Sequence, residues 1–221
     1  MQLIREIGFL LQKEFTLEWR QKYAISGILL YVLSTVYIVY SSFTKLEPAI
    51  WNIQFWVIIL FASVSAVVKS FQQESGQRQL YYYSLANPLA VLLSKMLYNT
   101  LLLLFLSILA YLALSLVAGN QVQQAQPFAL ALLLGSLGFS ITFTFVSAIA
   151  SKASNSATLM AILSFPLIIP VLMTLIKMTA AAVTTANPAA IDLREDLLTL
   201  VAIDLLLLGA ALALFPFLWR D

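Results

Sequence analysis

The feature that most constrains this sequence is a long stretch, residues 96–151, that contains no Asp, Glu, Lys or Arg. A soluble element needs a polar face toward water, and charged side chains normally supply much of it. Of the 221 residues, 62% are hydrophobic and 10% are charged, whereas soluble domains average about 25% charged residues. Within a bilayer, helices satisfy their own backbone hydrogen bonds. The sequence therefore predicts an all-α integral membrane protein.

Composition also excludes several classes of function. Twelve Lys and Arg against ten Asp and Glu give a net charge of +2 without a basic block, so we expect no nucleic-acid partner. The sequence has no Cys and no His, which excludes disulfides, thiolate chemistry and histidine ligation of zinc or heme iron by this chain. It has no GxxxxGK[ST] motif either, so it cannot hydrolyse ATP through a P-loop. We expect no catalytic residue, no metal site and no cofactor that this chain binds stably.

The gaps between charges predict the membrane spans, because a spanning helix needs about 20 apolar residues. The long uncharged stretch is divided by turn-forming residues around Gly119 and Pro127. The sequence thus predicts an amphipathic segment, 1–22, and a transmembrane domain, 23–221, with a cytoplasmic loop at 69–95. The six predicted spans lie near residues 23–44, 48–68, 96–118, 128–150, 157–176 and 197–218.

The distribution of Lys and Arg predicts the orientation of these spans. Nine of the twelve fall in the N-terminal segment, in the loops after the second and fourth spans, and at the C-terminus. The alternate loops hold the remaining three, which are Lys45, Lys177 and Arg194. Both termini are therefore expected in the cytoplasm.

Residues 1–22 predict a helix that lies in the membrane interface, because their apolar and polar side chains separate on a helical wheel. Glu14 and Glu18 depart from this pattern, since they share an edge of the apolar side. One account has them reach to the surface or pair with Lys22. The other has them meet a cationic partner beneath the bilayer.

The cytoplasmic loop 69–95 is polar at first and then aromatic. Asn87 followed by Pro88 predicts a helix N-cap, so we expect the third helix to begin there. The three tyrosines at 81–83 fit either an interfacial aromatic belt or a docking surface for a soluble partner. Glu74 and Arg78, one helical turn apart, fit an exposed ion pair as well.

The fourth and fifth spans contain two patterns that affect helix packing. Small residues recur every four positions in the fourth span, beside Gly135 and Gly138, which favours close helix packing over a polar substrate track. These residues are Ser136, Ser140, Thr144 and Ala148. In the fifth span, Pro166 and Pro170 each remove a helical hydrogen bond, and the resulting kink is either static or a gating hinge.

Asp204 is a carboxylate inside an apolar run, about 10 Å along the sixth helix from Leu197 and in its outer half. An ionisable group inside the membrane is a functional hypothesis by default. Two structural explanations stand beside it: this end of the helix is hydrated, or Lys177 supplies a salt bridge. A lone carboxylate without a second acid, base or metal ligand is too little for an active site.

Several stretches of the sequence resemble one family of membrane proteins. They are KEFTLEWR at 13–20; Phe71, Glu74 and Gly76 ahead of Leu85, Pro88 and Lys95; LLLGSLGFSI at 132–141; and LSFPLIIPVL at 163–172. With the amphipathic N-terminal segment, six spans and no ATPase motif, the chain resembles ABC-2-type permease subunits. In particular, it is similar to the heme exporter protein B family (CcmB) of cytochrome c maturation.

The resemblance implies a type V exporter-like permease in the bacterial cytoplasmic (inner) membrane. Two copies of the chain would assemble with two CcmA-like ATPase subunits, a heme-handling CcmC-like membrane protein and a small one-helix CcmD-like subunit. Heme would be the transported or handled ligand, and ATP would bind the partner subunit.

The resemblance also implies roles for three segments. Residues 1–22 match the elbow helix, with Glu14, Glu18 and Arg20 among its residues, and 178–196 match a partly helical extracellular segment. Residues 71–83 match the coupling helix that enters a cleft of the ATPase. The residues expected to contact the ATPase, spaced three or four apart on one helical face, are Phe71, Glu74, Arg78 and Tyr82.

Two alternatives to a heme permease stay open from the sequence. The first is an ABC-2 exporter of another cargo, such as a glycan, a lipid or a drug. The second is an ion-coupled carrier or membrane enzyme that uses Asp204.

Overall fold

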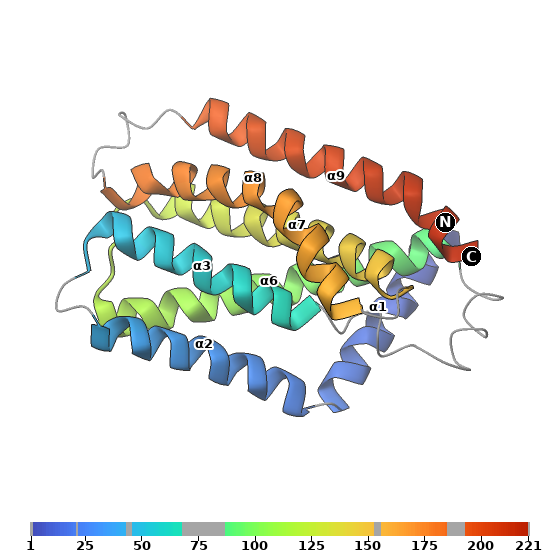
Figure 1. Cartoon of the computed structure of the whole chain (residues 1–221), viewed down its shortest axis with the longest axis horizontal. Helices are drawn as coiled ribbons and strands as arrows, with labels where there is room; N and C mark the ends of the chain where they lie inside the picture. Colours follow the sequence, from blue (N-terminus) through green and yellow to red (C-terminus); the bar gives the residue numbers. More distant parts are fainter. Residues whose placement is uncertain are drawn as a thin grey trace.

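The computed structural model describes residues 2–20, 22–42, 46–67, 87–152, 156–184 and 193–220. Within these ranges the regular elements are all helices, and they form an elongated bundle (Figure 1). The helices are α1 (Gln2–Arg20), α2 (Lys22–Ser42), α3 (Pro48–Val67), α6 (Pro88–Ala118), α7 (Ala125–Ala150), α8 (Ser156–Thr184) and α9 (Arg194–Arg220).

Five of these helices are long and apolar enough to cross a membrane. They are α3, α6, α7, α8 over Thr158–Thr184 and α9 over Arg194–Leu218. The first predicted span corresponds to α2, of which the part searched, Ser26–Ser41, is apolar but too short to meet the same criterion by itself. The chain is therefore a multi-pass helical membrane protein, and five of its six predicted spans meet this criterion of length and composition.

α6 begins at the predicted N-cap. The side chain of Asn87 accepts a hydrogen bond from the backbone N–H of Leu89 (3.0 Å), and Pro88 is the first helical residue. A proline costs little there, because the first N–H groups of a helix have no intrahelical acceptor. The N-cap prediction is confirmed. The helix then continues to Ala118, so Lys95 lies well inside it and does not mark its start.

The predicted turn between α6 and α7 is present and is tied to α8. Gly119 has a φ of 84°, a backbone conformation that glycine adopts at low cost. The side chain of Asn120 accepts a hydrogen bond from the backbone N–H of Val122 (3.0 Å). The next two backbone N–H groups, of Gln123 and Gln124, both donate to the carbonyl oxygen of Ala182 at 3.0 Å.

α8 is longer than the sequence predicted, because it continues past residue 176 to Thr184. The prediction ended the span before Lys177 on the rule that charges mark span ends. The side chain of Lys177 is 70% exposed, and its Nζ lies 2.7 Å from Oδ1 of Asp196. The helix therefore carries this charge without burying it. Within the expected extracellular segment 178–196, residues 185–192 lie outside the described part of the chain.

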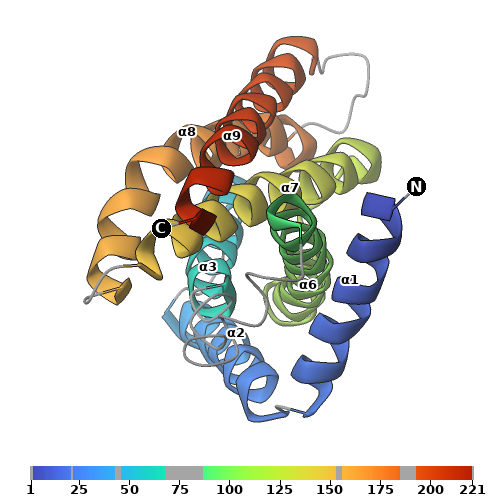
Figure 2. The ribbon, with the colours of Figure 1, turned by 90° about the vertical axis from the view of Figure 1, so that its right-hand side faces the viewer.

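α7 has the largest buried share among the five spanning helices. It packs against α3, α6, α8 and α9. In the end-on view of Figure 2, α3, α6 and α7 lie at the centre, with α1 on one side and α8 on the other. This central position explains why α7 is rich in small residues, since they let neighbouring helices approach closely.

Candidate functional site

The N-terminal helix α1 lies at the end of the bundle where α9 ends, and it packs mainly against α6 (Figures 1 and 2). The ring of Phe15 meets the ring of Tyr98 edge to face, with centroids 5.2 Å apart. Ile4 and Phe9, on the part of α1 away from this contact, are largely exposed. α1 therefore combines a packed side toward α6 with exposed apolar residues, as an interfacial helix does.

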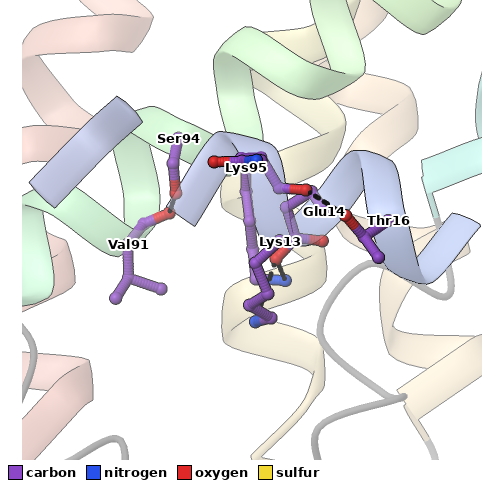
Figure 3. A network of polar contacts seen from close by, with 7 residues as sticks. Lys13, Glu14, Thr16, Val91, Ser94 and Lys95 are labelled. Atoms are coloured by element: carbon purple, nitrogen blue, oxygen red, sulfur yellow. Dashed lines mark hydrogen bonds and ion pairs between the residues drawn. The ribbon is translucent and has the colours of Figure 1, made fainter. Parts of the chain in front are cut away.

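An ion-pair cluster joins α1 to α6 next to this aromatic contact (Figure 3). Nζ of Lys95 lies 3.1 Å from Oε1 of Glu14, and Nζ of Lys13 lies 3.2 Å from the same oxygen. The Lys95 side chain is only 1% exposed and that of Glu14 13%. Removing an ammonium group from water is unfavourable unless it is paired and hydrogen-bonded. Glu14 is thus a carboxylate partner of the buried Lys95.

Glu14 meets a cationic partner, as one of the two accounts of the carboxylates in α1 suggested, and this partner is Lys95, 81 positions later in the same chain. The side chain of Lys22 lies outside the described part of the chain. Glu18 and Arg20 belong to the last turn of α1, and their side chains lie outside the described part. A sequence signal for the pair does exist, because Lys95 sits at the edge of a long uncharged stretch.

One turn further along α6, hydrogen bonds connect it to α7. The hydroxyl of Ser140 donates to the backbone oxygen of Met96 (2.6 Å), and the amide of Asn99 donates to Oγ1 of Thr144 (2.8 Å). Ser136 and Ala148, the other members of the small-residue stripe, are buried as well. In this arrangement the hydroxyls of Ser140 and Thr144 hold α6 and α7 together. This is the packing role that the spacing of small residues favoured.

A second polar network, between α3 and α8, was not anticipated from the sequence. The indole N–H of Trp56 donates to Oγ1 of Thr179 (2.8 Å), and the Asn52 amide donates to the backbone oxygen of Ile176 (2.9 Å). Asn52 Oδ1 lies 2.8 Å from the Thr179 hydroxyl. All three side chains are buried, so their hydrogen bonds offset the cost of removing polar groups from water. The sequence signal that could have revealed this network is Asn52, a polar residue within an apolar run.

Two glycines of α7 make room for side chains of other helices. A Cβ atom on Gly135 would lie 2.9 Å from the ring of Trp56 and 3.0 Å from Leu175. A Cβ atom on Gly138 would collide with the carboxylate of Asp204. The glycines therefore let α3 and α9 approach the α7 backbone closely.

Asp204 is buried at this α7–α9 contact, with 4% of its surface exposed. Within the described ranges, neither carboxylate oxygen has a hydrogen-bond partner. Both structural explanations offered by the sequence are wrong: the site is not open to solvent, and Lys177 pairs with Asp196 instead. The contacts of the described residues therefore give no explanation for the burial of Asp204.

The amino-acid sequence of residues 5–219 matches the protein family described as CcmB protein. The chain belongs to the CcmB family. This match extends from α1 to the end of α9, over nearly the whole chain. A search of the curated proteins found no match. Membership of this family, the heme exporter protein B family, implies a membrane component of heme export in c-type cytochrome biogenesis, and it confirms the resemblance drawn from the motifs.

The expected ATPase-contacting residues of this CcmB-family chain are Phe71, Glu74, Arg78 and Tyr82. They fall in residues 68–86, outside the described part of the chain. The structure does describe what this segment connects, since α3 ends at Val67 and α6 is capped by Asn87. The segment therefore joins two helices that both pack against α7.

Metal-binding groups are not evident in the described part of the CcmB-family chain. No group of three or more His, Cys, Asp or Glu side chains was found there that could hold a metal ion. In the sequence as a whole, Cys and His are absent. Heme iron, if this chain contacts heme, would need axial ligands of another kind or from another subunit.

Pro166 and Pro170 lie within the continuous helix α8. Both are on its exposed side. The hydroxyl of Thr174 donates to the backbone oxygen of Pro170 (2.8 Å), so the turn after the second proline is reinforced by a side chain. A static bend and a gating hinge both fit this arrangement.

We expect Asp204→Asn to retain most cytochrome c maturation and Asp204→Leu to lower it. Asn preserves the size and polarity of the side chain beside Gly138, whereas a branched Leu overpacks the α7–α9 contact and destabilises it by about 1–3 kcal/mol. Heme staining of c-type cytochromes in cells that express each variant gives the measurement. Loss of all activity in a stably expressed Asn variant would instead support a carrier that needs the ionisable group.

Proposed function

We propose that this chain is the permease subunit of an ABC-type complex for heme export or trafficking in c-type cytochrome biogenesis, driven by a separate ATPase subunit. The observation that carries the proposal is the CcmB-family match over residues 5–219. Apolar helices that can cross a membrane support it. So does an N-terminal helix that packs at one end of the bundle as an elbow helix does.

The ATPase is assigned to a partner because the sequence has no P-loop motif. Energy from ATP must then reach the spans through a cytoplasmic surface. Residues 1–22 and 69–95 are the longest candidate segments on that side. The second joins two spans, so a force applied there acts on both of them. We therefore assign the ATPase contact to Phe71, Glu74, Arg78 and Tyr82.

The proposed assembly contains two copies of this chain and two CcmA-like ATPase subunits, with CcmC-like and CcmD-like membrane partners. Heme is the proposed ligand that the complex transports or handles, and ATP binds the partner subunit. The site of heme contact is assigned to the complex, since this chain has no His or Cys for axial ligation.

Co-purification tests this function. A tagged full-length chain, extracted in mild detergent from its native host, is expected to retain a P-loop subunit, and deletion of its gene should abolish holocytochrome c. Substitution of the P-loop lysine in the partner is the matched control, because it should abolish maturation while the complex stays assembled. Normal cytochrome c levels in the deletion strain would contradict a role in heme export.

The proposed topology has six spans, with α2 as the first, and places both termini and residues 69–95 in the cytoplasm of a bacterial cell. It rests on the distribution of Lys and Arg, nine against three. The chain contains no native Cys, so a single Ser75→Cys substitution gives an unambiguous label. We expect an impermeant thiol reagent to modify it in inverted vesicles and not in intact cells. Labelling from outside intact cells would contradict the orientation.

Two other functions are kept as alternatives. An ABC-2 exporter of a glycan, lipid or drug would retain an ATPase but leave cytochrome c unaffected when deleted. An ion-coupled carrier is favoured by one observation, the buried carboxylate of Asp204 without a hydrogen-bond partner in the described structure. A carrier would purify without a P-loop subunit.

A further inference from the structure

The contact between α1 and α6 contains a buried ion pair and an aromatic contact, and such interactions favour a fully closed arrangement over a partly separated one. Lys95 is 1% exposed and its Nζ lies 3.1 Å from Oε1 of Glu14, so moving the two helices apart would break a buried ion pair, which is costly in a water-poor environment. Phe15 and Tyr98 contact each other next to it. A paired charge and an aromatic contact, side by side, favour two discrete arrangements: closed, or opened to water.

The position of this contact in the chain determines which helices can move together. Glu14 and Lys95 are 81 positions apart, so the pair connects the N-terminal helix to a helix that begins directly after residues 68–86. α1 is followed at once by α2, which packs against both α3 and α6. A displacement of the start of α6 therefore reaches α1 directly through the α1–α6 contact and indirectly through α2, and the α1–α6 contact is more extensive than the α1–α2 contact.

We propose that the Glu14–Lys95 pair is a positioning joint that holds α1 and α6 together as one rigid unit. When the ATPase displaces residues 68–86, and with them the start of α6, the joint makes α1 move with α6. The inference rests on the proposed function, since it assumes that an ATPase drives residues 68–86. Glu14 and Lys95 contact neither ATP nor cargo. They act through the relative placement of two helices, and Nζ of Lys13 lies 3.2 Å from the same oxygen of Glu14.

The test uses the complete complex with its ATPase and compares Glu14→Gln and Lys95→Met with the wild type. Each variant is expected to retain the ATPase and to hydrolyse ATP within about twofold of the wild type, while holocytochrome c falls about tenfold, a typical size for coupling between two sites. The exchange Glu14→Lys with Lys95→Glu restores the pair in reverse and is expected to recover most of the holocytochrome c.

Lys177→Met is the matched control. Its ion pair with Asp196 is shorter, at 2.7 Å, but the lysine is 70% exposed and lies at the opposite end of α8 from α1. We expect wild-type holocytochrome c and wild-type ATP hydrolysis from this variant.

Chemical cross-linking separates a joint from a purely structural contact. The chain has no native Cys, so Glu14→Cys with Lys95→Cys can be bridged by a short bifunctional thiol reagent that a reductant cleaves. Bridging is expected to restore holocytochrome c output, and cleavage to abolish it again. Bridging of Lys177→Cys with Asp196→Cys should change neither.

Three results would overturn the joint. They are full holocytochrome c output from the single variants, a loss of output only in proportion to the amount of complex that accumulates, and a failure of bridging to restore output. Each of these leaves the proposed function intact if the wild-type chain retains its ATPase. Absence of an ATPase from the wild-type complex would overturn both.

Discussion

Simultaneous replacement of Phe71 and Tyr82 by Ala is expected to weaken binding of the ATPase subunit by about 1–4 kcal/mol, the range for interface hot spots. The spacing of the two residues places them on one face of a helix together with Glu74 and Arg78. Aromatic side chains at a protein interface bury a large apolar area. Pull-down of the ATPase by the tagged chain, at several ATPase concentrations, measures the change in affinity.

Gln73→Ala with Leu80→Ala is the matched control. These residues fall on the opposite side of the same predicted helix, so their replacement should leave ATPase binding near the wild-type value. The membrane domain should fold in both double variants, because the helices that the structure describes lie outside residues 68–86. If ATPase binding and cytochrome c maturation both survive the first double change, the coupling assignment is wrong.

The approximate positions of the helices could be predicted because they depend on local properties of the sequence. Uncharged runs located α3, α6, α7, α8 and α9, and an Asn-Pro pair located the start of α6. Such signals act within a few residues of the position they describe. Backbone hydrogen bonds inside an apolar helix need no information from distant parts of the chain.

Charged residues were the least reliable guide, because their meaning depends on partners far away in the sequence. Lys95 and Lys177 were both taken to mark the ends of spans. The structure buries Lys95 against Glu14 and leaves Lys177 exposed beside Asp196, and in both cases the helix passes through the charge. A sequence shows the charge but not the tertiary contact that accommodates it.

The same limit applies to the candidate site in α7. The spacing of small residues indicated close packing, but it did not indicate that Trp56 fills the space at Gly135 or that Asp204 faces Gly138. No role was predicted for Asn52 and Thr179, although their hydrogen bonds hold the indole of Trp56 in place. Single polar residues in apolar helices become informative only when their partners are known.

Substitution of Gly135 by Ala is expected to destabilise the folded protein by about 1–3 kcal/mol, the usual cost of overpacking a core. The added Cβ would lie 2.9 Å from the Trp56 ring and 3.0 Å from Leu175, closer than carbon atoms pack without strain. The ring cannot move away freely, because it is fully buried and its N–H donates to Thr179. Unfolding of the purified chain in mixed detergent micelles, followed by tryptophan fluorescence, measures the loss.

Gly209→Ala provides the control for glycine removal itself, because nothing lies within 4 Å of the new Cβ in α9. That variant should be unchanged or more stable by up to about 1 kcal/mol, since Ala is the better helix former. The Trp56→Phe background provides the second control. A smaller ring makes room for the methyl group, so Gly135→Ala should cost less there, and the difference measures the Gly135–Trp56 contact directly. Equal stability of Gly135→Ala and Gly209→Ala would show that α3 and α7 are not packed through Trp56.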